Sequence, residues 1–332
     1  SAGDDDDTSA DDDDDTSAGA DVGEGATPGC EVDEVSPAYP EADGAEFYYR
    51  GSVEFVFDGI DEDATITLAD AAGTAVDGST SWMDNKLSFT PSAPLAPSTQ
   101  YSTTLTHCGG ESTIGFITGS LGGPLDEGVD LVGNTYVVNL DDANFVKPAG
   151  VGGLLLGLLE QHILLGVTEV TDTEIKMMGA ISKDKPSTDQ DTCDPSISFP
   201  AGADFTTAPF FSIGPETTSL SVAGISVNIN DLMFAGDFAS DGTYIGGAIL
   251  SGLLDAAELA GVLVDNGLIE EEDPSAVCDL IATFGVACED CGDGRAECLS
   301  IYVDRITAEE TGTALIEVET CDVDTCEGGC AE

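Results

Sequence analysis

Between residues 37 and 119, apolar and polar positions form a series of short alternating runs. The run 52–59, SVEFVFDG, places Val53, Phe55 and Phe57 on one face of an extended chain. Alternation with a period of two is typical of a strand that buries one face. Similar runs recur at intervals of about 8 to 15 residues without a helical period, at 45–51, 64–70, 86–91, 99–108 and 111–119. These six or seven strands predict a β-sandwich over residues 30–120.

Beyond a joint rich in Gly and Pro at 121–128, the pattern indicates longer strands. The run 219–229, SLSVAGISVNI, predicts one long alternating strand. Residues 234–250 predict a hairpin with its turn at 240–242. Other runs predict strands at 134–140, 163–170, 173–181, 298–308 and 313–320.

Three segments of this second region have the spacing of helices. Residues 251–267 carry apolar side chains three or four positions apart, and 273–285 begins with Pro274 just inside the helix and ends at a glycine. The uncharged run that begins at residue 149 stops at Glu160, short of the about 20 residues that a membrane-spanning helix needs. We therefore expect a buried helix there, followed by a strand.

These elements predict a mainly β protein, and a chain of 332 residues is long enough for two domains. We expect a disordered acidic tail or spacer over residues 1–29 and the sandwich over 30–120. A linker follows at 121–128. A larger β-rich domain, either a sheet or a barrel with two or three helices, then covers 129–332.

Charge narrows the classes of partner. The chain has 65 Asp and Glu residues against 8 Lys and Arg, a formal net charge of −57. Phosphate contacts need Lys and Arg, so nucleic acid is a poor partner, and an anionic membrane surface is no better. A surface this acidic stays hydrated and repels itself unless salt screens it. A salty or cation-rich habitat explains this composition, and selection for solubility alone is the alternative.

The first 29 residues contain two runs of Asp and no aromatic side chain. Such a segment does not bury enough apolar surface to fold, so we expect a spacer. Its carboxylates are expected to bind calcium only weakly, because no fixed cage of ligands holds the ion.

Ten cysteines, most of them after residue 277, are the main candidates for chemistry. A zinc site at Cys278, Cys288, Cys291 and Cys298 has one C-x-x-C pair where tetrahedral sites favour two. A redox C-x-x-C needs electropositive surroundings, and the acids within and after CEDC oppose a thiolate. Structural disulfides are the favoured interpretation, with zinc and redox chemistry as alternatives, and they indicate an oxidising compartment.

Spacing suggests some of the disulfide partners. A bridge between Cys30 and Cys108 would tie the start of the sandwich to a late strand, and Cys278–Cys288 and Cys291–Cys298 are plausible short-loop pairs. Sequence does not determine the connectivity of the remaining four, which would supply further bridges: Cys193, Cys321, Cys326 and Cys330.

Other catalytic and metal-binding patterns are weak. The chain has two histidines, His107 and His162, which we interpret as packing, capping or surface residues rather than as catalytic bases. Asp58, Asp61 and Asp63 lie in one loop and offer hard oxygen ligands, so this loop is a candidate Ca²⁺ site, with a solvated turn as the alternative. Carboxylate pairs suit glycoside hydrolysis, but with 65 acids some pair always has the right spacing.

The segment 86–119 resembles the bacterial Ig-like domain of surface-layer and cell-envelope proteins. In that family a strand ends in Thr-Pro, a Pro-Leu turn follows, and a Tyr opens the next strand; here these are Thr90-Pro91, Pro94-Leu95 and Tyr101. The last strand ends in Phe-x-Thr, here Phe116 to Thr118, and the opening SPAYPEADG at 36–44 also fits. The resemblance covers residues 37–119 and implies a spacer or stalk. It also implies that the Tyr101 hydroxyl pins the turn, as in a tyrosine corner.

Two further features resemble bacterial lipoproteins. The Ser-Ala-Gly-Asp start and the acidic spacer dotted with Ser and Thr look like the region after a lipidated cysteine, which implies an anchor before Ser1. The pattern C-x-x-C-x-D-G-x-x-x-C between a helix and a strand is similar to that of surface lipoproteins of predatory and marine bacteria of the myxobacterial kind. Those lipoproteins have no assigned activity that the resemblance would carry over.

The sequence favours a non-catalytic secreted or surface-anchored protein of the bacterial cell envelope with a structural or interaction role, of which self-assembly is one form. Its expected partners are proteins or envelope components, a second copy included, and no nucleic acid. Membrane contact is expected only through an N-terminal lipid anchor outside this chain. The alternative is an extracellular protein that binds an apolar small ligand in the domain 129–332. A carboxylate-dependent polysaccharide hydrolase is the more distant alternative.

Overall fold

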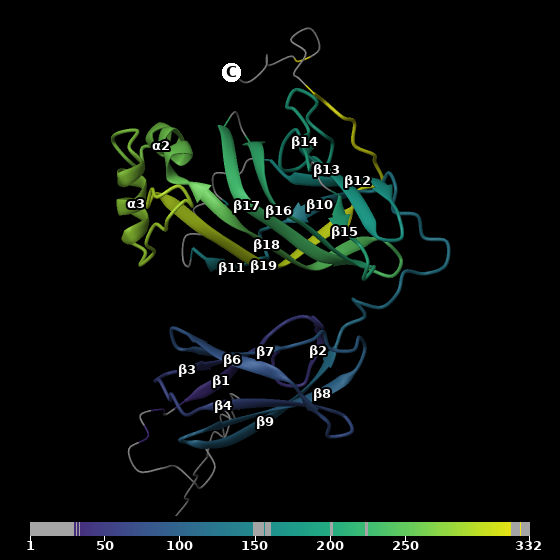
Figure 1. Cartoon of the computed structure of the whole chain (residues 1–332), viewed down its shortest axis with the longest axis vertical. Coiled ribbons are helices and arrows are strands. Elements are labelled where there is room, and N and C mark those ends of the chain that lie inside the picture. The colour runs from purple at the N-terminus through teal and green to yellow at the C-terminus, as the bar shows by residue number, and fades with distance from the viewer. Residues whose placement is uncertain are drawn as a thin grey trace, which may run out of the picture. The chain divides into compact units, whose positions relative to one another are not determined.

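The computed structural model describes residues 34–148, 161–199, 202–222 and 225–319, together with Cys30, Val32, Leu156 and Cys326 (Figure 1). The chain divides into two compact units, Ser1–Thr118 and Gly119–Glu332. The expected tail at 1–29 and the expected helix at 149–160, Leu156 apart, lie outside the described residues. Within the described residues, no helix is both long enough and apolar enough to span a bilayer.

The first unit is a sandwich of two sheets. One sheet has the order β1-β3-β7-β6 and the other β2-β9-β8-β4-β5. The alternating side chains Val53, Phe55 and Phe57 are buried between the sheets, as predicted. The strands are β1 (Val35–Tyr39), β2 (Gly44–Phe47), β3 (Val53–Phe57), β4 (Thr65–Asp70), β5 (Ala75–Val76), β6 (Gly78–Met83), β7 (Lys86–Pro91), β8 (Gln100–His107) and β9 (Gly110–Thr118).

Three strands of the sandwich were not predicted, and all three lie at sheet edges. β1 contains Pro37, β5 has two residues, and β6 reads GSTSWM with most of its side chains exposed. An edge strand buries little, so it has no reason to alternate apolar and polar residues. The expected strand at 45–51 is shorter, because β2 ends at Phe47.

The Tyr101 hydroxyl does pin the turn before its strand. Its oxygen accepts a hydrogen bond from the backbone N–H of Ala96 at 3.0 Å. The Thr118 hydroxyl donates to the carbonyl of Ala96 at 2.7 Å, so the end of β9 is fastened to the same turn. The tyrosine corner implied by the family resemblance is confirmed.

The second unit is a closed barrel of eight antiparallel strands. The order is β10-β12-β13-β15-β16-β17-β18-β19, and β19 pairs back with β10, so the circle closes. β11 continues β10 along the edge of β19, and β14 pairs with β13 next to the stretch of β13 that pairs with β15. The strands are β10 (Thr135–Asn139), β11 (Asn144–Lys147), β12 (Ile163–Val170), β13 (Glu174–Ile181), β14 (Ile197–Ser198), β15 (Ala203–Asp204), β16 (Phe210–Val222), β17 (Ile225–Phe238), β18 (Tyr244–Asp255) and β19 (Cys298–Glu310).

Three predictions for this unit were wrong in part. The segment 219–229 is not one strand, since Val222 pairs with Ile225 and the chain reverses between β16 and β17. The apolar positions shift from even to odd numbers between Val222 and Ile225, and the prediction of one strand overlooked this change of phase. Leu253 and Leu254 belong to the end of β18 rather than to a helix. The segment 313–319 forms no strand.

The two helices of the described residues lie side by side at one end of the barrel (Figure 1). α2 (Ala256–Asp265) begins where the Asp255 carboxylate accepts from the N–H of Ala257. α3 (Pro274–Ala282) begins at Asp273 in the same way, with Pro274 in its first turn as predicted. These caps supply acceptors for backbone N–H groups that have no partner inside the helix.

Candidate functional site

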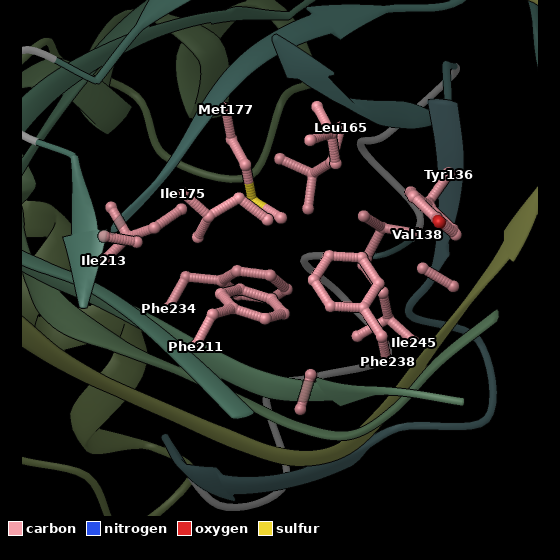
Figure 2. Close-up of a cluster of buried hydrophobic side chains, with 14 of the residues drawn as sticks. Tyr136, Val138, Leu165, Ile175, Met177, Phe211, Ile213, Phe234, Phe238 and Ile245 are labelled. Carbon is pink, nitrogen blue, oxygen red and sulfur yellow. The ribbon is translucent and has the colours of Figure 1, made fainter. Parts of the chain in front are cut away.

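The barrel interior is filled by aromatic rings at one end. Phe238 has its ring centroid 5.4 Å from Tyr136, 6.1 Å from Phe205 and 5.1 Å from Phe211. Figure 2 shows Phe211, Phe234 and Phe238 facing the side chains of Ile175, Met177 and Leu165 across the barrel. The Tyr136 hydroxyl donates to the carbonyl of Gly242 in the β17–β18 turn at 2.8 Å. This end of the barrel, which we name the aromatic plug, is closed by packing.

The other end of the interior contains a cavity of about 80 Å³. It lies where β10, β13, β16 and β18 end and where β12 and β17 begin, because neighbouring strands run in opposite directions. Its walls expose only apolar surface, from side chains that include Val138, Ile163, Ile229, Leu232, Leu250 and Ile306. We name this space the barrel cavity.

Thr218 is the one wall residue of the barrel cavity with a polar side chain. It is 6% exposed, and its hydroxyl oxygen has no hydrogen-bond partner in the part of the chain that the structure describes. Thr135, at the start of β10 and away from the cavity, is the other described threonine in that condition. Buried hydroxyls usually have a hydrogen-bond partner, so burying each of these two hydroxyls without one lowers the stability of the folded barrel.

A larger hollow of about 310 Å³ lies beside β10 and the start of β12. Asp141, His162, Lys185 and Glu309 line it, and the Lys185 ammonium lies 3.6 Å from an Asp141 carboxylate oxygen. The backbone N–H of His162 donates to the Ser182 hydroxyl at 2.8 Å. The hydrolase alternative needs two carboxylates that face one substrate. Asp141 and Glu309 both line this hollow, but Asp141 is paired with Lys185, so the hydrolase alternative stays a prediction.

His107, the other histidine, lies in the sandwich. Its ring meets Phe57 edge-on with centroids 6.0 Å apart, and its Nδ1 accepts from the N–H of Gly109 at 3.1 Å. Both contacts are those of a packing residue at the end of β8, which was one of the roles expected for it.

The cysteines form structural bridges in the described residues. Cys30–Cys108, Cys278–Cys288 and Cys291–Cys298 are bonded in the pairs that spacing suggested. Cys193 is bonded to Cys326. The remaining two, Cys321 and Cys330, lie outside the described residues. The four cysteines considered for zinc or redox chemistry are thus joined to one another in two disulfides.

Arg295 ties the loop that the Cys291–Cys298 bridge closes to the start of α2. Its guanidinium contacts Asp255 at 2.7 Å and Asp293 at 2.8 Å. The pKa of Asp293 lies below its usual value, because its carboxylate accepts from the backbone N–H and then from the side chain of Arg295. Asp255 and Asp293 therefore hold the loop in place through Arg295. Because Arg295 is paired with these acids, it is not a cation that would stabilise a thiolate here.

The structure does not assemble the calcium site expected at Asp58, Asp61 and Asp63. No three His, Cys, Asp or Glu side chains of the described residues are grouped so that they could hold a metal ion. The Asp61 carboxylate instead accepts from the N–H of Cys108 at 2.6 Å and from the N–H of Asp63 at 3.1 Å. Asp61 is used to fix the loop against β8, and sequence spacing did not reveal this competing use.

Sequence analysis did not find the barrel cavity or Thr218. Glu216 and Thr218 lie two residues apart in one strand and are both polar, so the sequence pattern indicates a polar face that points outward. The cavity walls come from strands between residues 138 and 306, so no local pattern joins them. The sequence signal that pointed to an enclosed space was the high apolar content of this region. It led to the alternative prediction of an apolar ligand bound in the domain 129–332.

Residues 34–108 match the family model described as a bacterial Ig-like domain. The match confirms the Ig-like assignment of the sandwich, and the resemblance to surface lipoproteins stays a prediction. A comparison with curated protein sequences gives no match.

Several solved structures have weak similarity to the chain. L,D-transpeptidase 1 of Mycobacterium tuberculosis is 17% identical over 45% of this chain and 74% of that one, with a TM-score of 0.21. A protein of the DUF4784 family from Bacteroides caccae is 9% identical over 68% and 78%, with a TM-score of 0.21. A three-domain Ig fragment of titin is 10% identical over 67% and 59%, with a TM-score of 0.19. These scores are too low to bear on fold or function.

Proposed function

We propose that this protein is a non-catalytic interaction protein of the bacterial cell surface, in which the Ig-like unit is a spacer and the barrel is a disulfide-bonded head. The observation that carries the proposal is the bacterial Ig-like match over residues 34–108. The four disulfides of the described residues support it, because such bridges persist outside the reducing cytosol. The net charge of −57 supports it as well, since this surface stays hydrated in salt.

The location is tested on intact cells of the producing bacterium with a membrane-impermeant amine reagent. Lys147, Lys176 and Lys183 have about half of their side chains exposed, so they are available to react. We expect the protein to be labelled before lysis while a cytosolic enzyme in the same cells is labelled only afterwards. Labelling of both proteins only after lysis would refute the surface location.

Thiol alkylation with intact-mass measurement tests the oxidising compartment. We expect no cysteine of the native protein to react before reduction and all ten to react after it. Immediate reaction of Cys288 or Cys291 in freshly isolated protein would show that the bridges are not its native state. Zinc and redox chemistry would then have to be reconsidered.

Self-association is the finer form of this proposal, and β6 is the sheet edge best suited to it. In the described residues, β6 has a partner on one side only and pairs with β7 without a bulge from Gly78 to Met83. It has no charged residue and no proline. The other sandwich edges are interrupted by Pro37, by a register shift in β2, or by a length of two residues. Edges without charge, proline or bulge are those that pair with another chain.

These features favour a second copy of this chain as the partner that pairs with β6. Two chains of charge −57 repel each other, and the uncharged β6 is where two backbones approach at the smallest electrostatic cost. The Debye length falls from about 8 Å at physiological ionic strength to about 3 Å at 1 M salt, so the repulsion between two copies weakens and pairing is expected to strengthen with salt.

Sedimentation of the whole protein at 0.15 M and 1 M NaCl tests this form of the proposal. We expect concentration-dependent dimers in 1 M NaCl, lost in Ser81→Glu, which places a charge on the exposed edge. Thr106→Glu is the matched control, because it adds the same charge at an exposed position of β8 in the middle of a sheet. A monomer at both salt concentrations, or equal dimerisation of both variants, would exclude pairing through β6.

A further inference from the structure

The hollow of about 310 Å³ beside β10 lies on the outer side of the barrel wall. Val137 of β10 and Thr307 and Glu309 of β19 line it, while their neighbours Val138 and Ala308 belong to the barrel core. Successive residues of a strand point to opposite faces, so the three lining side chains point outward. The volume of this space, which we name the outer hollow, is within the range of small-molecule sites.

Several polar groups of the outer hollow are already used within the protein. The Lys185 ammonium lies 3.6 Å from an Asp141 carboxylate oxygen. The Asn139 amide donates to the Asp142 carboxylate at 3.0 Å, and its carbonyl oxygen accepts from the N–H of Asp141 at 3.0 Å. A ligand that used these groups would have to replace contacts that they make already.

The Glu309 carboxylate and the His162 imidazole are available to a ligand. Both residues line the outer hollow, and neither side chain has a hydrogen bond or an ion pair with another described residue. Glu309 is on β19 opposite Val137, and His162 directly precedes β12, which pairs with the other side of β10. Neighbouring strands lie about 4.8 Å apart, so a ligand over β10 lies between these two side chains.

Charge indicates which kind of ligand suits them. Lys185 is neutralised by Asp141, so the charge without an ion pair among the described Asp, Glu and Lys side chains of the outer hollow is that of Glu309. The net charge of the chain is −57, which attracts cations and repels anions. The outer hollow is therefore suited to a cation and unsuited to a carboxylate or a phosphate.

Hydrogen bonding favours an ammonium group over a metal ion. A primary ammonium has three N–H donors, a carboxylate accepts, and a neutral imidazole accepts at one ring nitrogen. Glu309 and His162 thus offer acceptors on two sides of one ammonium group. No three His, Cys, Asp or Glu side chains of the part that the structure describes are grouped so that they could hold a metal ion.

The rest of the outer hollow suits a carbon skeleton. Val137, Leu140 and Ile163 are among its walls. A volume of about 310 Å³ is about twice the 150 Å³ of an engineered cavity that accepts benzene. A six-membered ring with an amino group therefore fits within it.

We propose that the outer hollow binds a small organic primary ammonium ion. Its N–H groups donate to Glu309 and His162, and its carbon skeleton packs against Val137, Leu140 and Ile163. This inference does not depend on where the protein is located or on pairing through β6.

The test uses the whole untagged protein in 0.15 M NaCl at pH 7, with cyclohexylamine as the probe. This amine is protonated at pH 7, like a lysine side chain. The chain has two histidines, so NMR of the imidazole rings compares His162 in the outer hollow with His107 in the sandwich. We expect saturable shifts of the His162 signals and none of the His107 signals. No saturable shift at His162, or equal shifts at both rings, would overturn the proposal.

Three further compounds separate the parts of the ligand. Cyclohexanol keeps the ring without the charge, ammonium chloride keeps the charge without the ring, and cyclohexanecarboxylate reverses the charge. At equal concentration, the first two are expected to shift His162 less than cyclohexylamine does, and the third not at all. Equal binding of cyclohexanol or cyclohexanecarboxylate would overturn the role of charge, and equal binding of ammonium chloride that of the apolar walls.

Two matched variants test the carboxylate. Glu309→Gln is expected to weaken cyclohexylamine binding about 2- to 5-fold, the effect of one exposed ion pair, and to leave cyclohexanol binding unchanged. Glu111→Gln removes the same charge from an exposed position of β9 in the sandwich and is expected to change neither. Equal effects of the two variants would overturn the role of Glu309.

A third variant tests the place of binding. Thr307→Arg puts a long cationic side chain into the outer hollow from an exposed position of β19 and is expected to abolish cyclohexylamine binding. Thr113→Arg adds the same charge at an exposed position of β9 and is expected to leave binding unchanged. Retained binding in Thr307→Arg would show that the probe binds elsewhere.

Discussion

The sandwich and the barrel bury their apolar faces in two different ways. In the sandwich, two open sheets pack face to face and fill the interior between them. Their edge strands, β6 above all, keep unpaired backbone groups in the described residues. The barrel pairs β19 with both β18 and β10, so its circle has no edge, but a curved sheet encloses a space that side chains must fill. Pairing with another chain is therefore expected at an edge strand of the sandwich rather than at the closed circle of the barrel.

The units also differ in how disulfides constrain them. One bridge, Cys30–Cys108, closes a loop with a sequence separation of 78 in the sandwich. The barrel unit has two bridges with separations of 10 and 7, and one of 133 that fastens Cys326 to Cys193. The long closures restrict the unfolded chain most in the chain-entropy model.

Removing the long bridge of the sandwich is expected to have a larger effect than removing a short bridge of the barrel. Cys30→Ser with Cys108→Ser is expected to lower the free energy of unfolding of the sandwich by about 4.5 kcal/mol, against about 2.7 kcal/mol for the matched pair Cys278→Ser with Cys288→Ser in the barrel. Trp82, the single tryptophan, lies in β6, so its fluorescence in urea reports the sandwich alone. Equal losses for the two pairs would contradict the dependence on loop length.

A slightly smaller effect is expected at the aromatic plug. Phe238→Ala removes a fully buried ring that contacts three others, and it is expected to cost the barrel about 4 kcal/mol. The midpoint of barrel unfolding, followed by circular dichroism, should fall while the Trp82 transition stays in place. A shift of both transitions would show that the two units do not unfold independently.

The tyrosine corner is expected to contribute less. Tyr101→Phe removes the hydroxyl that accepts from the N–H of Ala96 and is expected to cost the sandwich about 1 kcal/mol in urea, read from Trp82 fluorescence. Tyr39→Phe removes a comparable hydrogen bond outside the corner, from the backbone N–H of Tyr48 at 3.0 Å, and is expected to cost a similar amount. No change in the Trp82 midpoint of Tyr101→Phe would show that the hydrogen bond is offset by solvation.

The smallest effect is confined to high pH. The pKa of Tyr136 lies above the usual value of 10.0, because burial disfavours the phenolate and the charges of Glu310 and Asp241 add to this. The folded barrel therefore holds this proton more tightly than the unfolded chain, which contributes stability that is complete below about pH 10 and lost as pH rises through the folded pKa.

Tyr136→Phe should remove this part of the pH dependence. Barrel unfolding followed between pH 9 and pH 11.5 is expected to be less pH-dependent in the variant than in the parent protein. Tyr244→Phe, also in the barrel, controls for the general effect of alkaline pH on the remaining tyrosines. Identical pH dependence of the parent and Tyr136→Phe would contradict the raised pKa.

The sequence by itself determined what depends on neighbours along the chain. Alternation located β3, β4 and β12, Pro274 marked the start of α3, and cysteines close in sequence were paired correctly. The Thr-Pro to Tyr segment identified the Ig-like unit, because its turn chemistry is local.

Tertiary structure decided what depends on residues far apart. Closure of the barrel requires β10 to pair with β19, about 170 residues later, and no local pattern specifies that pairing. The same holds for Asp61, whose carboxylate was expected to bind calcium and instead caps the N–H of Cys108. Thr218 looks like an outward-facing residue in a polar stretch and becomes a cavity wall only when the sheet curves shut around it, because closure rather than alternation selects which face is inside.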